Sequence, residues 1–188
     1  METHHDHHHH GSHQATSAHF PTNSAGLPDS ASTEIVELAD GDELELRIAP
    51  VAKRIGDATV RMLAYNGSVP GPTLRVRQGP QVVVNVANDG DLDATVHWPG
   101  LRLDNRYDGT HETQGPIPVD GTFTYRLDFP NPGVYWYHPH IREDYGQELG
   151  LYGNIVVVTV KDDYWPPANA CMRTSTRRPT TRSPSSRS

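Results

Sequence analysis

The segment Thr122–Phe129 has the clearest hydrophobic pattern in the chain, because apolar and polar side chains alternate along its whole length. The apolar positions are Phe123, Tyr125, Leu127 and Phe129, and the polar positions are Thr122, Thr124, Arg126 and Asp128. A period of two places successive side chains on opposite faces of an extended backbone. The segment is therefore predicted to be a β-strand with one buried face.

Similar alternation, or a short run of β-branched and aromatic residues, recurs at intervals along the chain. Further strands are predicted at Leu44–Ile48, Ala58–Tyr65, Thr73–Val76, Gln81–Asn88, Ala94–His97, Val134–His138 and Asn154–Val160. Turn-forming pairs such as Asn66-Gly67 and Asp120-Gly121 separate them. No segment keeps a helical period, although Glu143–Leu151 is expected to form one or two helical turns at most. Seven or eight short strands in about 130 residues predict an all-β fold, a sandwich or a barrel.

The two ends of the chain differ in composition from this β-rich middle. Residues 1–32 are rich in His, Ser, Gly and Asn, and they are expected to be a disordered His-rich arm or a purification tag. Residues 164–188 are rich in Arg, Ser and Thr and are expected to be a disordered tail. The folded domain is therefore predicted to span residues 33–163.

Charge and composition exclude several classes of protein. The net charge is −7, and because five arginines follow Cys171, residues 1–170 hold 11 basic and 23 acidic groups, a balance of −12. Such acidity argues against a nucleic-acid partner. The longest aliphatic run, Ile155–Val160, is too short to span a membrane, and no signal peptide is recognisable. A single cysteine excludes a disulfide scaffold.

Two histidines of the β-rich region suggest metal-binding chemistry. His138 and His140 are two residues apart at the end of the aromatic strand Tyr135-Trp136-Tyr137, so in extended backbone both imidazoles point to one side. Imidazole is a good ligand for copper and zinc, and a pair on one strand is partly preorganised for either ion. On its own, such a pair is also compatible with surface histidines at a strand end.

Several motifs in a fixed order give these histidines a context. They are Asn66–Arg75, Val96–Leu101, Asp108-Gly109, Gln114–Ile117, Gly133–His140 and Gly150–Val157. In that order they closely resemble the first cupredoxin domain of the laccase-like multicopper oxidases, over roughly Glu34 to Val160. The resemblance implies a cupredoxin-like Greek-key β-sandwich. It also implies a share of a trinuclear copper cluster, at which this family reduces dioxygen to water.

The resemblance also implies roles for individual residues. His97 matches a ligand of the type 2 copper, and His138 and His140 match ligands of the type 3 copper pair. Pro99 stands where the family has a fourth histidine, so one type 3 copper is expected to lack a donor. Asp108 matches an acidic residue that assists proton delivery, although a plain turn residue is an equal alternative.

Other polar residues near these motifs have simpler interpretations. His111 is expected to be an exposed loop histidine, with a supporting role at the cluster or in a substrate loop as the alternative. Glu143, Asp144 and Glu148 are expected to be solvated acids, with hydrogen bonds to the ligands as the alternative.

The family oxidises its substrate at a type 1 copper, which a cysteine and two histidines of the last domain hold. Cys171 has no neighbouring histidine. We therefore expect the copper-binding N-terminal domain of a laccase-like oxidase, a family that oxidises phenolic or metal substrates and is usually exported. Alone, the domain is expected to be inactive. The alternatives are a standalone copper-binding or storage protein, and a cupredoxin module that assembles with copies of itself or with separate cupredoxin domains.

Overall fold

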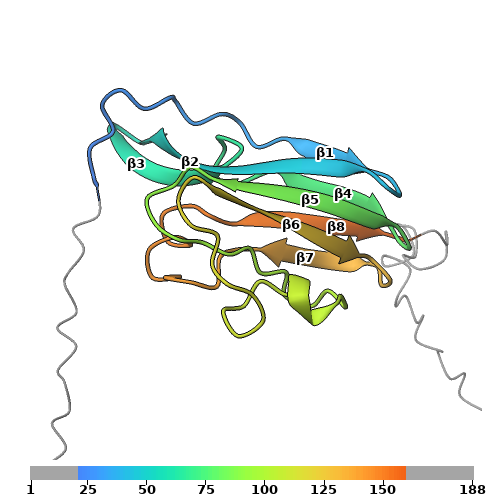
Figure 1. Cartoon of the computed structure of the whole chain (residues 1–188). Coiled ribbons are helices and arrows are strands. Elements are labelled where there is room, and N and C mark those ends of the chain that lie inside the picture. The colour runs from blue at the N-terminus through green and yellow to red at the C-terminus, as the bar shows by residue number, and fades with distance from the viewer. Residues whose placement is uncertain (1–20, 160–188) are drawn as a thin grey trace, which may run out of the picture.

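The computed structural model describes residues 21–159, which form two packed four-stranded sheets (Figure 1). The strands are β1 (Ile35–Leu38), β2 (Glu43–Ile55), β3 (Ala58–Tyr65), β4 (Thr73–Arg77), β5 (Gln81–Asn88), β6 (Gly121–Asp128), β7 (Gly133–Tyr137) and β8 (Gly153–Val158). The short 3-10 helix η1 (Asn105–Tyr107) is the one helical element within residues 21–159. No helix in this part of the chain is long and apolar enough to cross a membrane. The expected tail from residue 164, and the expected arm as far as residue 20, lie outside the described residues.

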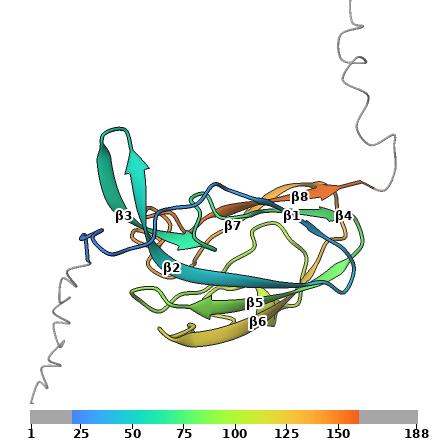
Figure 2. The same ribbon diagram turned by 90° about the horizontal axis from the view of Figure 1, so that it is seen from above.

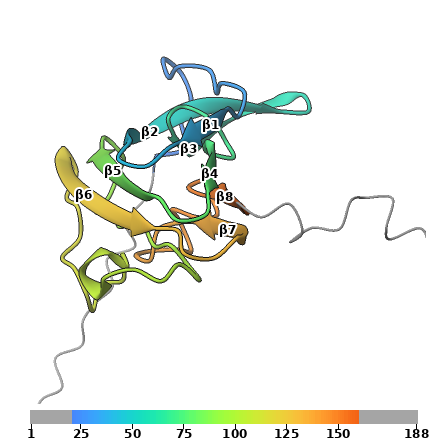
Figure 3. The same cartoon turned by 90° about the vertical axis from the view of Figure 1, so that its right-hand side faces the viewer.

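The strand order is that of a Greek-key sandwich, because neighbours in space are often distant in the sequence. One sheet has the order β1-β4-β8-β7 and the other β3-β2-β5-β6 (Figures 2 and 3). Strand β2 is long enough to serve two neighbours: Glu43–Ile48 pairs with β5 in parallel, and Ile48–Ile55 pairs with β3 in antiparallel. The tip of the β2–β3 hairpin therefore projects beyond the two layers (Figure 2).

The core lies between the sheets and follows the alternation of the sequence. In β6, Tyr125 and Leu127 are fully buried, whereas Thr124 and Arg126 are exposed. Trp98 fills the middle of the core, with its ring centre 5.5 Å from that of Tyr125 and 5.5 Å from that of Tyr137. Large aromatic side chains contribute much of the apolar area that folding removes from water.

The expected all-β, cupredoxin-like sandwich is confirmed, with two local differences. Ala94–His97 is not a strand, because only its ends pair, and each pairs with a different segment: Ala94 with Ile117 and His97 with His138. The helical turns expected within Glu143–Leu151 occur as single turns, such as the one closed by the Leu149 N–H donating to the Tyr145 carbonyl at 2.9 Å, and they do not join into a helix. That segment forms a series of hydrogen-bonded turns, since two glycines in nine residues disfavour a continuous helix.

Two residues before the expected domain start at residue 33 are hydrogen-bonded to the sandwich. The Ser30 N–H donates to the Ala52 carbonyl at 2.8 Å, and the Ala31 N–H donates to the Gly67 carbonyl at 2.8 Å. These backbone hydrogen bonds attach the segment before β1 to β2 and to the turn after β3. They need no pattern of apolar side chains, so hydrophobic periodicity could not reveal them.

Candidate metal centre

The centre of the candidate site is a backbone pairing between His97 and His138. The His97 N–H donates to the His138 carbonyl at 2.7 Å, and the His138 N–H donates to the His97 carbonyl at 3.2 Å. Directly opposed residues of an antiparallel pair carry their side chains on the same face. The two imidazole ring centres are accordingly 5.5 Å apart.

His140 reaches the same face through a side-chain hydrogen bond. Its backbone N–H donates to the Thr95 hydroxyl at 3.0 Å, and Thr95 is fully buried. The ring centre of His140 lies 5.1 Å from that of His97 and 6.5 Å from that of His138. The structure thus brings together all three histidines that the sequence singled out. Sequence reasoning missed Thr95, although its position two residues before His97 places it on the same side of extended backbone.

Backbone carbonyls fix the orientation of two of these rings. The Nδ1 of His97 lies 2.6 Å from the Asp108 carbonyl oxygen, and the Nδ1 of His138 lies 2.8 Å from the Pro139 carbonyl oxygen. A carbonyl can only accept, so each Nδ1 carries the proton and donates it. The Nε2 atoms keep their lone pairs, which is the arrangement found in metal-binding histidines.

His138 is further held in the neutral form that binds metals. Burial lowers the pKa of His138; the Pro139 carbonyl opposes this effect, and the nearby His97 adds to the lowering. The ring also stacks on Trp136, with ring centres 4.0 Å apart and an interplanar angle of 21°. The stacking restricts rotation of the imidazole, so less entropy is lost when the ring binds an ion.

Asp108 lies directly beside His97, at the end of η1. The nearer carboxylate oxygen, Oδ2, is 3.6 Å from the His97 Nδ1, which is longer than a hydrogen bond. Gly109 explains the close approach of this loop: it has a φ of +82°, and a Cβ there would lie 1.9 Å from the Val96 carbonyl oxygen. Only glycine permits both the backbone conformation and the contact.

Pro99 occupies a tight turn immediately after His97. The Leu101 N–H donates to the Trp98 carbonyl at 3.2 Å, and Gly100 has a φ of +83°. Proline followed by a glycine with positive φ is the usual sequence of a type II turn. Proline is therefore well suited to the backbone at this position, although its side chain has no donor atom for a metal.

Of the other polar residues that the sequence singled out, some lie close to His97, His138 and His140 and others do not. His111 lies close to it, with its ring centre 6.2 Å from that of His140, and Glu143 has Oε1 3.6 Å from the His140 Nδ1. Asp144 is bound instead by Arg142, whose side-chain hydrogen bonds lower the pKa of this carboxyl. Glu148 lines a surface hollow beside Arg61 and Tyr145, and no contact joins it to the histidines among those that the structure gives.

The spacing of the rings suits ions that are shared by pairs of histidines. A ring nitrogen lies about 2.0–2.1 Å from a bound metal, so two rings on one ion have centres roughly 5 to 6.5 Å apart. All three ring pairs of His97, His138 and His140 are in this range. Within residues 21–159, however, no three His, Cys, Asp or Glu side chains converge on a single ion. An ion bound by any one of these pairs would need further donors.

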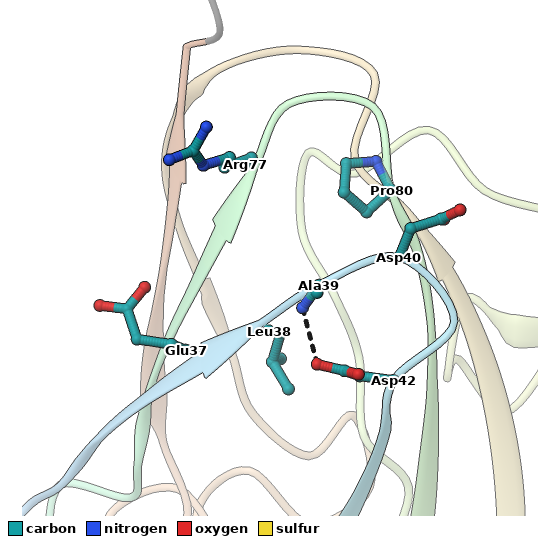
Figure 4. Close-up of a pocket in the computed structure, with 7 residues that line it drawn as sticks. All are labelled: Glu37, Leu38, Ala39, Asp40, Asp42, Arg77 and Pro80. Carbon is teal, nitrogen blue, oxygen red and sulfur yellow. Dashed lines mark hydrogen bonds between the residues drawn. The ribbon is translucent and has the colours of Figure 1, made fainter.

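A surface hollow of about 270 Å³ lies where β1 turns into β2 (Figure 4). This turn is at the opposite end of the sandwich from the end of β7 (Figure 1). Two of its acidic residues accept backbone hydrogen bonds. Asp42 accepts the Ala39 N–H at 2.7 Å, the dashed line in Figure 4, and Asp40 accepts the Gln81 N–H at 2.9 Å. These carboxylates stabilise the turn, and the hollow adds nothing to the histidine site.

Known proteins resemble this chain in both sequence and structure. The chain is 36% identical over 148 residues to the multicopper oxidase MmcO of Mycobacterium tuberculosis, which covers 76% of this chain and 29% of that protein. It is 41% identical over 99 residues to Laccase-1 of Botryotinia fuckeliana, which covers 50% of this chain and 17% of that protein. The chain thus spans less than a third of the length of these curated relatives.

The solved structures agree with the sequence comparisons. The blue copper oxidase from Nitrosomonas europaea superposes with a TM-score of 0.62 and 30% identity, covering 70% of this chain and 42% of that one. A multicopper oxidase from Pseudomonas thermotolerans gives a TM-score of 0.61 and 31% identity, with coverages of 69% and 31%. The sequence profile of the family described as multicopper oxidase matches residues 49–162, more than half of the chain. The chain therefore belongs to the multicopper oxidase family.

Proposed function

We propose that this chain is the N-terminal cupredoxin domain of a laccase-like oxidase and contributes His97, His138 and His140 to a trinuclear copper site. One observation carries the proposal. The three imidazoles lie on one face with ring centres 5.1 to 6.5 Å apart, and carbonyls hold the Nδ1 atoms of His97 and His138 so that their Nε2 lone pairs are free. This donor chemistry fits copper, for which neutral imidazole is a preferred ligand.

The three histidines have distinct roles in the proposed site. His97 binds the type 2 copper, and His138 and His140 bind the type 3 pair. When bound, copper supplies the one-electron chemistry by which the family couples oxidation of phenolic or metal substrates to reduction of dioxygen to water. The chain itself supplies orientation, because the paired backbones of His97 and His138 fix two rings before any ion arrives.

Asp108 is proposed to deliver protons at this site. Its carboxylate is partly exposed and lies 3.6 Å from the His97 Nδ1, so it can contact water on one side and the site on the other. A carboxylate in this position can take up a proton from the neighbouring water and pass it to the site. The carbonyl of the same residue orients His97, so the side chain can be changed while the ligand stays fixed.

The domain is proposed to bind copper without oxidising substrate by itself. A type 1 site needs a cysteine with histidines, and the one cysteine of this sequence, Cys171, has no histidine near it in the sequence. The remaining copper ligands would come from other cupredoxin domains, which are the partners we propose.

A copper titration and an oxidase assay together test this function. Both use the arm-substituted chain, the full chain with its first eight histidines replaced by Asn; these are His4, His5, His7, His8, His9, His10, His13 and His19. We expect copper binding that His97→Asn or His138→Asn weakens at least tenfold, with no intense blue absorption and no turnover of a phenolic substrate. Turnover of the phenolic substrate by the copper-loaded chain would contradict the proposal. So would a copper affinity that neither substitution changes.

A standalone copper-binding or storage protein is a second candidate, and the eight histidines within the first 20 residues favour it. Storage predicts that most of the bound copper belongs to these histidines. The copper stoichiometry of the unmodified chain should then exceed that of the arm-substituted chain several-fold. Equal stoichiometry in the two proteins would remove this candidate.

Self-assembly is a third candidate, and edge strand β7 favours it. Val134 and Trp136 are 73% and 40% exposed there, next to the histidine site. Large exposed apolar side chains beside a site commonly mark an interface. Light scattering of the copper-loaded arm-substituted chain should give a multiple of the monomer mass if copies assemble. A monomer at all concentrations would exclude assembly of this chain with itself.

A further inference from the structure

Asp91 and Tyr145 form a contact that links the two histidine-bearing segments of the chain. The Tyr145 hydroxyl donates to Oδ2 of Asp91 at 2.9 Å. Tyr145 follows His140 by five residues, and Asp91 precedes Thr95 by four. Because the Thr95 hydroxyl accepts the His140 N–H, the same two segments are joined at both points.

The contacts between these two segments follow one antiparallel order. They are His97 with His138, Thr95 with His140, and Asp91 with Tyr145. As one segment is followed backwards, the other advances by about the same number of residues, as in a pair of antiparallel strands. His140 therefore lies between a backbone pairing on one side and a hydrogen bond between side chains on the other.

Arg61 of β3 anchors Asp91 to the sheet. Its guanidinium donates through Nη2 to Oδ1 of Asp91, and the two side chains are only 7% and 13% exposed. The Arg61 Nε is buried and has no hydrogen-bond partner among the described residues. A buried ion pair that leaves an N–H unsatisfied adds little net stability, because desolvation of the charges offsets their attraction. The pair does fix where Asp91 lies, and with it the acceptor of the Tyr145 hydroxyl.

The chain between His140 and Tyr145 reverses its direction at Arg142. Arg142 has a φ of +48°, a conformation that residues with a side chain rarely adopt. Its carbonyl accepts the Tyr145 N–H at 2.9 Å and the Gly146 N–H at 2.8 Å. Such a backbone conformation persists where the surrounding contacts hold it, and the Tyr145 side chain supplies one of them. A displacement of Tyr145 would therefore reach His140 through a short and tightly bent link.

We propose that Asp91 and Tyr145 are positioning residues for His140. They hold its segment against that of His97 and so set the spacing of the two imidazoles, whose ring centres are 5.1 Å apart. This inference rests on the proposed function, because it takes His140 to be a copper ligand; both residues act through His140 and neither binds copper. Burial raises the pKa of Tyr145 to about 12, and the Asp91 carboxylate adds to the increase. The hydroxyl therefore keeps the proton that it donates at neutral pH.

Tyr145→Phe in the arm-substituted chain tests the positioning role, because it removes the hydroxyl and leaves the buried ion pair intact. In the metal-free chain, nuclear Overhauser contacts between imidazole protons report the His97–His140 and His97–His138 distances separately. We expect the first contact to weaken in the variant and the second to remain, since the backbone pairing is untouched. Cu²⁺ affinity should fall about two- to tenfold, because one more side chain must be ordered on binding.

Tyr137→Phe is the matched control, because it removes another buried tyrosine hydrogen bond. The Tyr137 hydroxyl donates to the Pro72 carbonyl at 2.7 Å, away from the contacts between the two segments. The control should lower the free energy of unfolding at least as much as Tyr145→Phe does. The imidazole contact between His97 and His140, and the copper affinity, should nevertheless stay as in the parent.

The outcomes separate the positioning role from the proposed function. If Tyr145→Phe kept both the His97–His140 contact and the copper affinity of the parent, the positioning role would be overturned and the proposed function would stand. Equal losses in Tyr145→Phe and Tyr137→Phe would also overturn the positioning role, because they would reflect a general loss of stability. A copper affinity that His140→Asn leaves unchanged would count against the proposed function instead, whereas the imidazole contact in the metal-free chain would still decide whether Tyr145 positions His140.

Discussion

His97 and His138 donate backbone hydrogen bonds to each other although 40 residues separate them in the chain. The pairing joins the segment after β5 to the end of β7, and it places both imidazoles on one face of the molecule. The geometry of the candidate site is therefore a property of the backbone pairing. Substitutions of residues that support this arrangement should therefore disturb the site without touching a histidine.

Thr95→Val should loosen His140. The substitution keeps the shape of the side chain but removes the hydroxyl that accepts the His140 N–H, leaving that donor without a partner. Because this hydrogen bond is only partly buried, we expect a loss of about 1 kcal/mol in urea unfolding. Copper affinity of the arm-substituted chain should fall as well.

Thr95→Ser is the matched control, because it retains the hydroxyl and loses only a methyl group. Its copper affinity should stay within about twofold of that of the parent. Its stability should fall only slightly. If Val and Ser at position 95 lowered copper affinity equally, the hydrogen bond to His140 would not be the cause.

Gly109→Ala should separate Asp108 from His97. A residue with a side chain costs about 1 to 2 kcal/mol in a left-handed backbone conformation, and here the added Cβ would also overlap the Val96 carbonyl. The loop must move, so the hydrogen bond from the His97 Nδ1 to the Asp108 carbonyl should break. We expect a lower free energy of unfolding in urea. Nuclear magnetic resonance of the histidine rings should show that His97 no longer keeps a single tautomer.

Gly115→Ala provides the comparison in the same loop region. A Cβ at Gly115 meets nothing within 4 Å, and its φ lies outside the left-handed range. Stability should therefore change by no more than about 0.5 kcal/mol. An effect as large as that of Gly109→Ala would show that the region tolerates no side chain, whatever the contact.

The sequence predicts the strands and the ligand residues better than it predicts how the residues meet. Strands β3 and β5 have the predicted bounds, and in β5 the burial of every second side chain imposes a period of two on the sequence. The spacing of His138 and His140 likewise indicates a shared side. The hydrogen bond between the His140 N–H and the Thr95 hydroxyl joins residues 45 positions apart. The hydrophobic pattern of the sequence does not predict this contact.

His111 shows the same limit more clearly. Its sequence surroundings are those of an exposed loop, and the side chain is indeed exposed. Its closeness to His140 depends on the packing of Gly109 against the Val96 carbonyl and on the turn that follows. Such positions are set by contacts between loops, which have no periodic signature.

Removal of metal should leave the domain folded. The core between the sheets is apolar and includes Trp98, Tyr125 and Tyr137, none of which depends on an ion. We expect a β-type far-ultraviolet spectrum and a cooperative melting transition in the presence of a strong chelator. Copper should raise the melting temperature only in proportion to its binding to the native state. Loss of the transition in chelator would mean that folding requires the metal.

Stability should fall steeply above pH 10 because of buried tyrosines. Burial raises the pKa of Tyr125 to about 12, and burial also raises the pKa of Tyr65 and Tyr137. A tyrosine of the unfolded chain ionises near pH 10, so the contribution of Tyr125 is complete below that pH and disappears as the pH approaches about 12. Urea unfolding between pH 8 and pH 11 should show this decrease.

Tyr125→Phe separates the ionisation from the hydrogen bond of this side chain. At pH 8 the variant should be less stable by about 1 to 3 kcal/mol, since the buried Val96 N–H loses its acceptor. Above pH 10 its stability should fall less steeply than that of the parent, because one buried ionisable group has gone. Parallel pH curves for the two proteins would show that Tyr125 does not contribute to the alkaline decrease.

Pro99→His should strengthen copper binding, because it places an imidazole two residues from His97. The turn from Trp98 to Leu101 owes its shape to Gly100 as well as to proline, so histidine at this position should keep the chain direction. A further donor held by the folded backbone loses little entropy on binding, and we expect Cu²⁺ affinity to rise about tenfold, or about 1.4 kcal/mol. The measurement is a competition titration in the arm-substituted chain, with Pro99→Asn as the control that changes the turn without adding an imidazole. Equal affinity for the His and Asn variants would mean that position 99 faces away from the metal, and it would weaken the assignment of His97 to the same site.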